Sequence, residues 1–362
     1  MIPIVVKGIG AIGGFGTGKA ALSRALESGI PQISELTVPT SQGPIKIPSY
    51  RADTGRLEDF VPKRALRRID HYSRLGLLGA YLALEDAGMF GSDLSRLGVV
   101  VASGYGATAT TFAFLDSIID SGDICASPTH FANSVHNAAA ANISIMLGAK
   151  GPSLTVSQFD MSVPSALASA GQWIEEGRVD AVLFGAIDEL SDLIGYLQHR
   201  RVGPDHASII SPLSREESSI IGEGAAFLLL TRKDDTPGYC AIDRVETGSI
   251  YQGDLHLPEN RLLILGADGR KELFNRYMTT VPRLSRVACY GSLYGSMPVA
   301  TAFDLAAAAL ILKNSQTYPI PGAAGCRMDG TPAPLETDRI LVLKLSGAHE
   351  YGTIDMSTDP GP

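Results

Sequence analysis

One predicted strand–turn–helix segment has the form in which a fold presents a nucleophile, yet its turn carries no cysteine. Residues 153–158 are predicted to form a buried strand and residues 165–177 a helix. Four residues fill or flank the turn: Gln158, Phe159, Asp160 and Met161. A helix N-terminus lowers the pKa of a thiol and so activates it, whereas a carboxylate is a poor acyl acceptor and a good helix cap. We therefore predict that Asp160 caps this helix.

Other reactive side chains do not form a recognisable centre. Ser157 and Ser162 would each need a neighbouring base, and the sequence nominates none. The cysteines show no CxxC pair, which indicates reduced thiols, and the histidines have no metal-ligand spacing. The cysteines are Cys125, Cys240, Cys289 and Cys326, and the histidines are His71, His130, His136, His199, His206, His256 and His349. We expect no metal site.

A glycine-rich turn near the N-terminus matches a nucleotide-binding pattern only in part. Residues 8–19, GIGAIGGFGTGK, contain Gly8-x-Gly10-x-x-Gly13 after a strand. Ala20 stands where a phosphate loop needs a magnesium-binding hydroxyl, and no acidic residue ends a clear second strand. The preferred interpretation is that these glycines pack a strand against a helix, and a nucleotide-binding enzyme is the alternative.

Composition limits the possible partners. The chain has 362 residues, of which 45% are hydrophobic and 19% charged, and its net charge is −8. This composition is typical of a globular α/β protein, and the acidic balance disfavours nucleic acid or anionic lipid as a partner. The N-terminus lacks a cationic leader, and the apolar runs are too short for a membrane span. We expect a cytoplasmic protein without membrane insertion.

Apolar runs and helical periodicity predict two halves of similar order, 1–235 and a shorter 236–362, with a mostly parallel buried sheet. In the first half we expect strands at 2–6, 97–104, 153–158, 179–189 and 222–233, and helices at 18–29, 63–89, 107–120, 138–148 and 165–177. Residues 37–62 and 121–137 are predicted to be irregular. In the second half we expect strands at 239–248, 261–265, 285–290 and 339–345, and helices at 269–279 and 299–313.

Several motifs together resemble the β-ketoacyl-acyl-carrier-protein synthases. The similarity is carried by VVKGIGAIGGFGTGKAAL, RALRRIDHYSRLGLLGAYLALEDAGM, NSVHNAAAANISIMLGAKGPSLTVS and IIGEGAAFLLL, and beyond residue 232 mainly by GSLYGSMPVATAFDLAAAALIL. The resemblance implies an α/β thiolase-like fold, in which two similar βαβαβαββ halves form a layered α-β-α-β-α sandwich.

The resemblance also places the family's reactive groups on this chain. Its cysteine nucleophile falls on Asp160, and its second histidine falls on Ser296, five residues after the position of its lysine, Gly291. The first histidine falls on Ala267 or Asp268, and the family's C-terminal loop belongs near residues 345–352. None of these positions keeps the reactive residue, so we expect no catalytic residues and a block on acyl loading.

The implied function is that of a non-catalytic subunit of the chain-length-factor type. Such a subunit pairs with an active ketosynthase in fatty-acid, polyketide or polyene-type chain elongation. The complex needs no cofactor of its own and takes a phosphopantetheine-linked acyl chain from an acyl carrier protein. The alternative is a homodimeric homologue that binds acyl thioesters or decarboxylates malonyl-carrier protein. Candidate interface or pocket residues are Phe112, Phe114, Asn133, His136 and Asn137, and candidate carrier-docking residues are Lys63, Arg64, Arg67 and Arg68.

Overall fold

The computed structural model describes residues 4–234, 236–252, 255–258, 261–282, 285–321 and 332–359. Its strands are β1 (Ile4–Gly13), β2 (Gly16–Thr17), β3 (Ser34–Val38), β4 (Ile45–Ser49), β5 (Leu97–Ala102), β6 (Ser153–Val156), β7 (Ala181–Asp188), β8 (Gly224–Arg232), β9 (Cys240–Ser249), β10 (Leu262–Leu265), β11 (Arg286–Ala288), β12 (Arg339–Leu345) and β13 (Glu350–Ser357). Its helices are α1 (Lys19–Ser28), α2 (His71–Asp86), α3 (Thr108–Ser121), α4 (Pro128–Ser134), α5 (Ala138–Leu147), α6 (Ser162–Glu175), α7 (Asp192–Val202), α8 (Lys271–Thr280) and α9 (Thr301–Asn314).

The strand order shows an internal duplication. One half of the sheet runs β6-β5-β7-β8-β1 and the other runs β11-β10-β12-β13-β9, so each half has its third, second, fourth, fifth and first strand in that order. In both halves the first two ladders of this order are parallel and the last two are antiparallel. Three residue pairs between β1 and β9 join the halves. The predicted pair of similar halves is confirmed, while the domain boundary at residue 235 stays a prediction. The predicted mostly parallel sheet is wrong, because half of the ladders within each half, and the ladder that joins the halves, are antiparallel.

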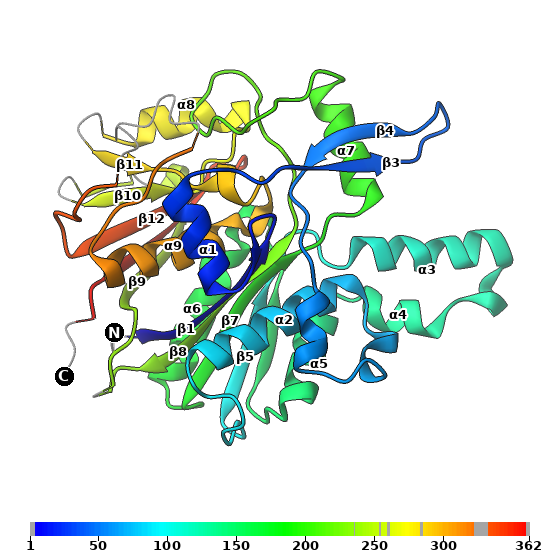
Figure 1. The fold of residues 1–362 in the computed structure, drawn as a ribbon, viewed down its shortest axis with the longest axis horizontal. Helices are drawn as coiled ribbons and strands as arrows, with labels where there is room; N and C mark the ends of the chain where they lie inside the picture. The colour runs from blue at the N-terminus through cyan, green and yellow to red at the C-terminus, as the bar shows by residue number, and fades with distance from the viewer. Residues whose placement is uncertain are drawn as a thin grey trace.

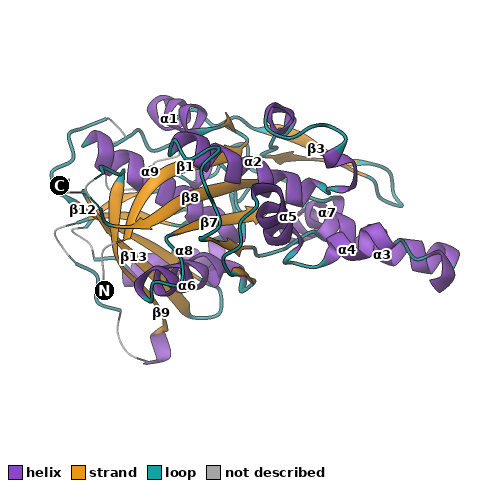
Figure 2. Ribbon diagram, turned by 90° about the horizontal axis from the view of Figure 1, so that it is seen from below, coloured by secondary structure: helices purple, strands orange, loops and turns teal. Residues whose placement is uncertain are grey.

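Helices form three layers around these strands (Figures 1 and 2). Helices α2 and α5 pack together over the outer face of the first half, and α8 packs over the outer face of the second. Helices α6 and α9 contact strands of both halves and share one apolar core, so they form the middle layer. The predicted α-β-α-β-α sandwich is thereby confirmed. Helix α9 is buried over most of its length, which explains its alanine-rich, almost uncharged sequence.

Several predicted boundaries are wrong. The helix expected at 63–89 begins only at His71, because Asp70 accepts a hydrogen bond from the Ser73 N–H and caps it there. The expected loop 37–62 contains the end of β3 and all of β4, which form an antiparallel hairpin, and the irregular 121–137 contains α4. Helix α7 and the strand β13 were not predicted.

The glycines of the nucleotide-like motif pack β1 against α2. A Cβ atom on Gly8 would lie 2.2 Å from the Ala83 carbonyl oxygen, and one on Gly10 would lie 2.1 Å from the Gly79 carbonyl oxygen. The Lys19 ammonium is bound by the Asp86 carboxylate and donates to the Tyr239 hydroxyl at 2.5 Å. The preferred interpretation of this motif is confirmed. Within the described ranges, no helix has both the length and the apolar content needed to cross a membrane.

Candidate functional site

The predicted turn is a sharp elbow between β6 and α6. A single 3-10 turn, Phe159–Met161, joins the two elements, and Phe159 has a positive φ of 44°. The Gln158 N–H donates to the Ser162 hydroxyl at 2.7 Å, and that hydroxyl donates to the Ser103 carbonyl at 3.0 Å. Helix α6 starts after Met161 without a side-chain cap. The predicted capping role of Asp160 is therefore wrong, because its carboxylate is directed to a cation instead.

Asp160 forms a two-point ion pair with Arg270, at the N-terminal end of α8. The Arg270 Nη2 lies 2.8 Å from Asp160 Oδ1 and its Nη1 lies 3.2 Å from Asp160 Oδ2. The Asp160 side chain is 8% exposed and that of Arg270 is 19% exposed. A buried bidentate ion pair fixes both side chains, because each terminal nitrogen of the guanidinium donates to its own carboxylate oxygen. The turn thus holds an anion that is already neutralised.

Two further charged residues complete this ion cluster, which we define as Asp160, Asp268, Arg270 and Lys344. The Arg270 Nε lies 3.0 Å from both Asp268 oxygens, and Asp268 Oδ2 accepts a hydrogen bond from Ser296 Oγ at 2.8 Å. The fully buried Lys344 ammonium lies 3.3 Å from Asp160 Oδ1 and donates to the Gly266 carbonyl at 3.0 Å. The cluster contains two negative and two positive groups.

The two positions predicted for the first family histidine have different surroundings. Asp268 points into the ion cluster, whereas Ala267 is buried in the core beneath α8. At Gly291, where the family's lysine falls, a Cβ atom would lie 2.9 Å from the Ala267 carbonyl oxygen. Lys344, on β12, provides the buried ammonium of this site. Sequence reasoning did not predict Arg270 or Lys344 as site residues. The one available signal for Lys344 was a lysine within the apolar run of β12.

The cluster is not suited to acid-base catalysis near neutral pH. Arg270 and Lys344 hold the pKa of Asp268 down at about 2 despite complete burial, and the same two cations hold the pKa of Asp160 below its ordinary value. The two carboxylates in turn raise the pKa of Arg270. General acid-base catalysis works best when the pKa lies near the operating pH. All three groups are therefore locked in their charged forms.

Two hollows meet at the cluster. The Ser296 hollow, of about 210 Å³, is lined by Tyr105, Gln198, Arg201, Ile221, Asp268, Arg270, Glu272, Ser296, Met297 and Pro298. The Phe159 hollow, of about 410 Å³, is lined by Tyr105, Gln158, Phe159, Asp160, Arg270, Pro298, Ser346, Gly347, Ala348 and Glu350. The loop between β12 and β13 thus closes one side of the Phe159 hollow, where the resemblance placed the family's C-terminal loop.

The sequence of residues 1–236 matches the family model "Beta-ketoacyl synthase, N-terminal domain". The chain belongs to the β-ketoacyl synthase family. A 3-oxoacyl-[acyl-carrier-protein] synthase 2 from Vibrio cholerae is 26% identical over 184 residues, which cover 48% of this chain and 44% of that protein. Nodulation protein E from Rhizobium meliloti is 27% identical over 234 residues, with 63% and 57% covered. The chain spans about half the length of the curated relatives it matches.

Solved ketosynthase structures share the fold over the whole chain. The ishigamide ketosynthase/chain length factor matches with a TM-score of 0.80 and 17% identity, covering 99% of both chains. A β-ketoacyl synthase from Burkholderia phymatum matches with a TM-score of 0.81 and 16% identity, covering 99% of this chain and 100% of the other. At these identities the likeness shows a thiolase-like fold. The position of Asp160 at the family's cysteine nucleophile stays a prediction.

The candidate interface residues lie away from the ion cluster, on and beside a projecting arm formed by α3 and α4. Both views show this arm extending from the body of the chain (Figures 1 and 2). Phe112 is exposed, and the partly buried Phe114 packs on Phe131 with ring centroids 5.4 Å apart. Asn133 donates to the Arg68 carbonyl at 2.8 Å. His136 and Asn137 are exposed, and the His136 ring packs beside Gly106.

The four candidate carrier-docking residues lie together on the surface before α2. Lys63, Arg64, Arg67 and Arg68 are all exposed, and a 3-10 turn at Ala65–Arg68 presents the last two. Lys63 lies 3.3 Å from Glu58. The structure therefore leaves this basic cluster accessible to an acidic surface.

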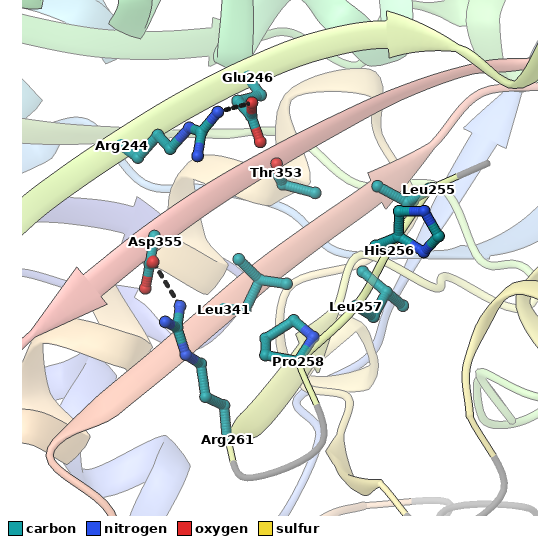
Figure 3. Close-up of a pocket in the computed structure, with 10 residues that line it drawn as sticks. All are labelled: Arg244, Glu246, Leu255, His256, Leu257, Pro258, Arg261, Leu341, Thr353 and Asp355. Atoms are coloured by element: carbon teal, nitrogen blue, oxygen red, sulfur yellow. Dashed lines mark hydrogen bonds and ion pairs between the residues drawn. The ribbon is translucent and has the colours of Figure 1, made fainter. Parts of the chain in front are cut away.

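A third hollow, of about 320 Å³, lies over β9, β12 and β13 in the second half (Figure 3). Its two arginines are each paired within the hollow: Arg244 lies 2.5 Å from Glu246, and Arg261 contacts Asp355. Leu255, His256, Leu257, Pro258, Leu341 and Thr353 complete the lining. Its charges are balanced by these pairs, so this hollow lacks the net charge that would select an ionic ligand.

One buried acid near the site should make stability depend on pH. Asp304, on α9, accepts a hydrogen bond from the Tyr294 hydroxyl, and burial raises its pKa to about 7. Because the unfolded carboxyl ionises near its ordinary value of 3.8, the contribution of this group to stability falls as pH rises from about 4 to about 7. Asp304→Asn should remove this loss, with a difference of up to about 1.4 kcal/mol per pH unit. Urea unfolding of the natural chain and of Asp304→Asn at several pH values measures this difference. Stabilities that change in parallel with pH would contradict a raised pKa at Asp304.

Proposed function

We propose that this chain is a non-catalytic β-ketoacyl synthase-like subunit that pairs with an active ketosynthase. The observation that carries the proposal is the binding of Asp160 by Arg270 and Lys344, at the turn where the resemblance places the family's nucleophile. The partner supplies the thiol and the imidazoles, and this chain helps to shape the space in which the acyl chain grows. The solved ketosynthase/chain length factor with the same fold offers a precedent for such a pairing.

The surface around β6 supports an association with another subunit. β6 is the last strand of the sheet on its side, so its outer hydrogen-bonding groups can accept another strand. The projecting arm carries large exposed apolar side chains: Phe112, Leu115, Ile119, Ile124 and Phe131. Apolar surface gathered on one protruding element is typical of an interface that a partner covers. We assign α3 and α4 to the contact with the ketosynthase.

The second partner in the proposal is an acyl carrier protein. The accessible basic cluster of Lys63, Arg64, Arg67 and Arg68 interrupts an otherwise acidic chain with a net charge of −8. Local positive charge of this kind attracts an acidic partner and speeds encounter. The carrier would deliver its phosphopantetheine-linked chain to the active subunit of the complex.

A homodimer that binds acyl thioesters is the competing function. The Phe159 hollow of about 410 Å³ favours it, since a partly apolar space can hold an acyl chain. The same strand edge and arm would then meet a second copy of this chain. The state of the purified chain separates these two functions.

Co-expression with an active ketosynthase tests the proposal. We expect a one-to-one complex by light scattering, and we expect Ile119→Asp to weaken it at least about tenfold, because the change places a charge in an apolar contact. Ile30→Asp is the matched control, since Ile30 is 65% exposed and lies outside the arm, while Ile119 is 76% exposed. A stable homodimer that leaves the synthase unbound, or equal effects of both substitutions, would contradict the proposal.

A further inference from the structure

The Ser296 and Phe159 hollows have three lining residues in common: Tyr105, Arg270 and Pro298. The Asp188 carboxylate fixes the backbone at two of them, because it accepts hydrogen bonds from the Tyr105 N–H at 2.9 Å and from the Val299 N–H, next to Pro298, at 3.3 Å. The third, Arg270, reaches with its side chain between Asp268 and Asp160. The Arg270 side chain is therefore part of the wall between the two hollows.

The Arg270 guanidinium is held at three nitrogens by two buried carboxylates. Both terminal nitrogens bind Asp160 and the Nε binds Asp268, at 2.8–3.2 Å. Swinging the side chain aside would leave both carboxylates without their main cation in a buried place, which is costly. The wall is therefore closed in the resting protein.

The two hollows differ in chemistry. The Ser296 hollow presents Gln198, Arg201 and Glu272, whereas the Phe159 hollow is lined in part by Phe159 and Ala348. A polar space next to a partly apolar one suits a polar amide-containing arm that carries an acyl chain.

We propose that Arg270 is the residue that excludes acyl-pantetheine from this subunit, by dividing one passage into two hollows. This inference rests on the proposed function and gives it a steric cause beyond the missing nucleophile. The Asp160 carboxylate then acts as a positioning residue, since it holds Arg270 across the passage. Removing both members of the bidentate ion pair should open the passage without leaving a net buried charge, because Asp268 and Lys344 remain.

Binding of an octanoyl-pantetheine amide, which has no cleavable thioester, tests this inference by calorimetry. We expect no saturable binding by the natural chain and at least about tenfold tighter binding by the double variant Asp160→Ala/Arg270→Ala. Asp160→Ala alone is the matched control. It keeps Arg270 attached to Asp268, so it should bind much less probe than the double variant. If the double variant does not fold, Asp160→Asn/Arg270→Gln, which retains polar side chains, replaces it with the same expectation.

Two outcomes would overturn the inference. One is saturable binding of the amide by the natural chain, and the other is a folded double variant that binds no more tightly than the natural chain. Either result leaves the pairing with a ketosynthase untouched, because that pairing is measured separately through the Ile119 and Ile30 variants. Failure of the pairing with normal exclusion of the amide would instead remove the proposed function and keep the role of Arg270.

Discussion

Replacing Arg270 with methionine should lower the free energy of unfolding by about 3–5 kcal/mol. The substitution keeps much of the side-chain volume but leaves the Asp160 and Asp268 carboxylates, 8% and 2% exposed, without their shared cation. Lys344 remains 3.3 Å from Asp160 and offsets only part of the loss. Urea unfolding of the natural chain and the variant at neutral pH gives the difference directly.

A double-mutant cycle identifies the cause of that loss. Adding Asp160→Ala to Arg270→Met should recover part of the stability, because the stranded carboxylate is removed, with a coupling of about 0.5–3 kcal/mol. Arg244→Met is the matched control, since the Arg244–Glu246 pair is largely exposed and its loss should cost less than about 1 kcal/mol. Equal losses at Arg244 and Arg270, or strict additivity at the cluster, would contradict a buried ion cluster.

The lowered pKa values of Asp160 and Asp268 set the pH range in which Arg270 stabilises the chain. The pKa of Asp268 is lowered from 3.8 to about 2 and that of Asp160 is also lowered, so their contribution is present above about pH 4. This contribution disappears as the pH falls toward about 2, because the folded carboxylates then take up protons. The difference between the natural chain and Arg270→Met should therefore shrink on acidification.

Replacing Asp188 with alanine should cost about 3–5 kcal/mol for a different reason. Its buried Oδ1 accepts hydrogen bonds from the Ser103 hydroxyl and from the Gly104 and Tyr105 N–H groups, at 2.9–3.1 Å. Each buried donor left without an acceptor costs about 1–3 kcal/mol. Because these donors fix Tyr105, the substitution should also loosen the wall common to both hollows. Thermal unfolding measures the first effect, and hydrogen exchange at residues 103–106 measures the second.

Asp188→Asn is the informative comparison for this carboxylate. The amide oxygen can accept the three hydrogen bonds of Oδ1, so we expect less than half of the loss seen with alanine. The remaining loss comes from the amide NH₂ group, which would face the Val299 N–H at the other oxygen position. If asparagine and alanine destabilise the chain equally, the hydrogen bonds are not the main contribution of this residue.

Local patterns in the sequence were sufficient for the main strands and helices of both halves and for the turn that carries Asp160. The apolar runs of β5, β7 and β8 have no competing periodicity, and the glycine-rich β1 packs on α2 as predicted. The strand β13 escaped prediction because its sequence, EYGTIDMS, mixes glycine with polar residues and is short of a continuous apolar run. This segment forms a strand because β12 and β9 pair with it on both sides, so tertiary context determines its secondary structure.

The ion cluster could not be assembled from the sequence. Asp160 and Arg270 are 110 residues apart, and they meet only because the two halves of the sheet place β6 and β10 around the same middle helices. The turn predicted a helix cap, and this prediction assumed that the nearest backbone would determine the role of Asp160. A buried guanidinium from the other half determines it instead. The role of Lys344 could not be predicted for the same reason, because a lysine in an apolar strand indicates a buried ion pair only once its partner, Asp160, is known.

The most direct measurement of the central claim is the intact mass of the chain after exposure to acyl carrier protein loaded with an acyl group. The account predicts an unchanged mass for this chain, alone or in complex with an active ketosynthase, and an acyl adduct on the ketosynthase. An acyl adduct on this chain, chased by elongation with a malonyl-loaded carrier, would contradict the claim that the ion cluster has replaced the reactive centre.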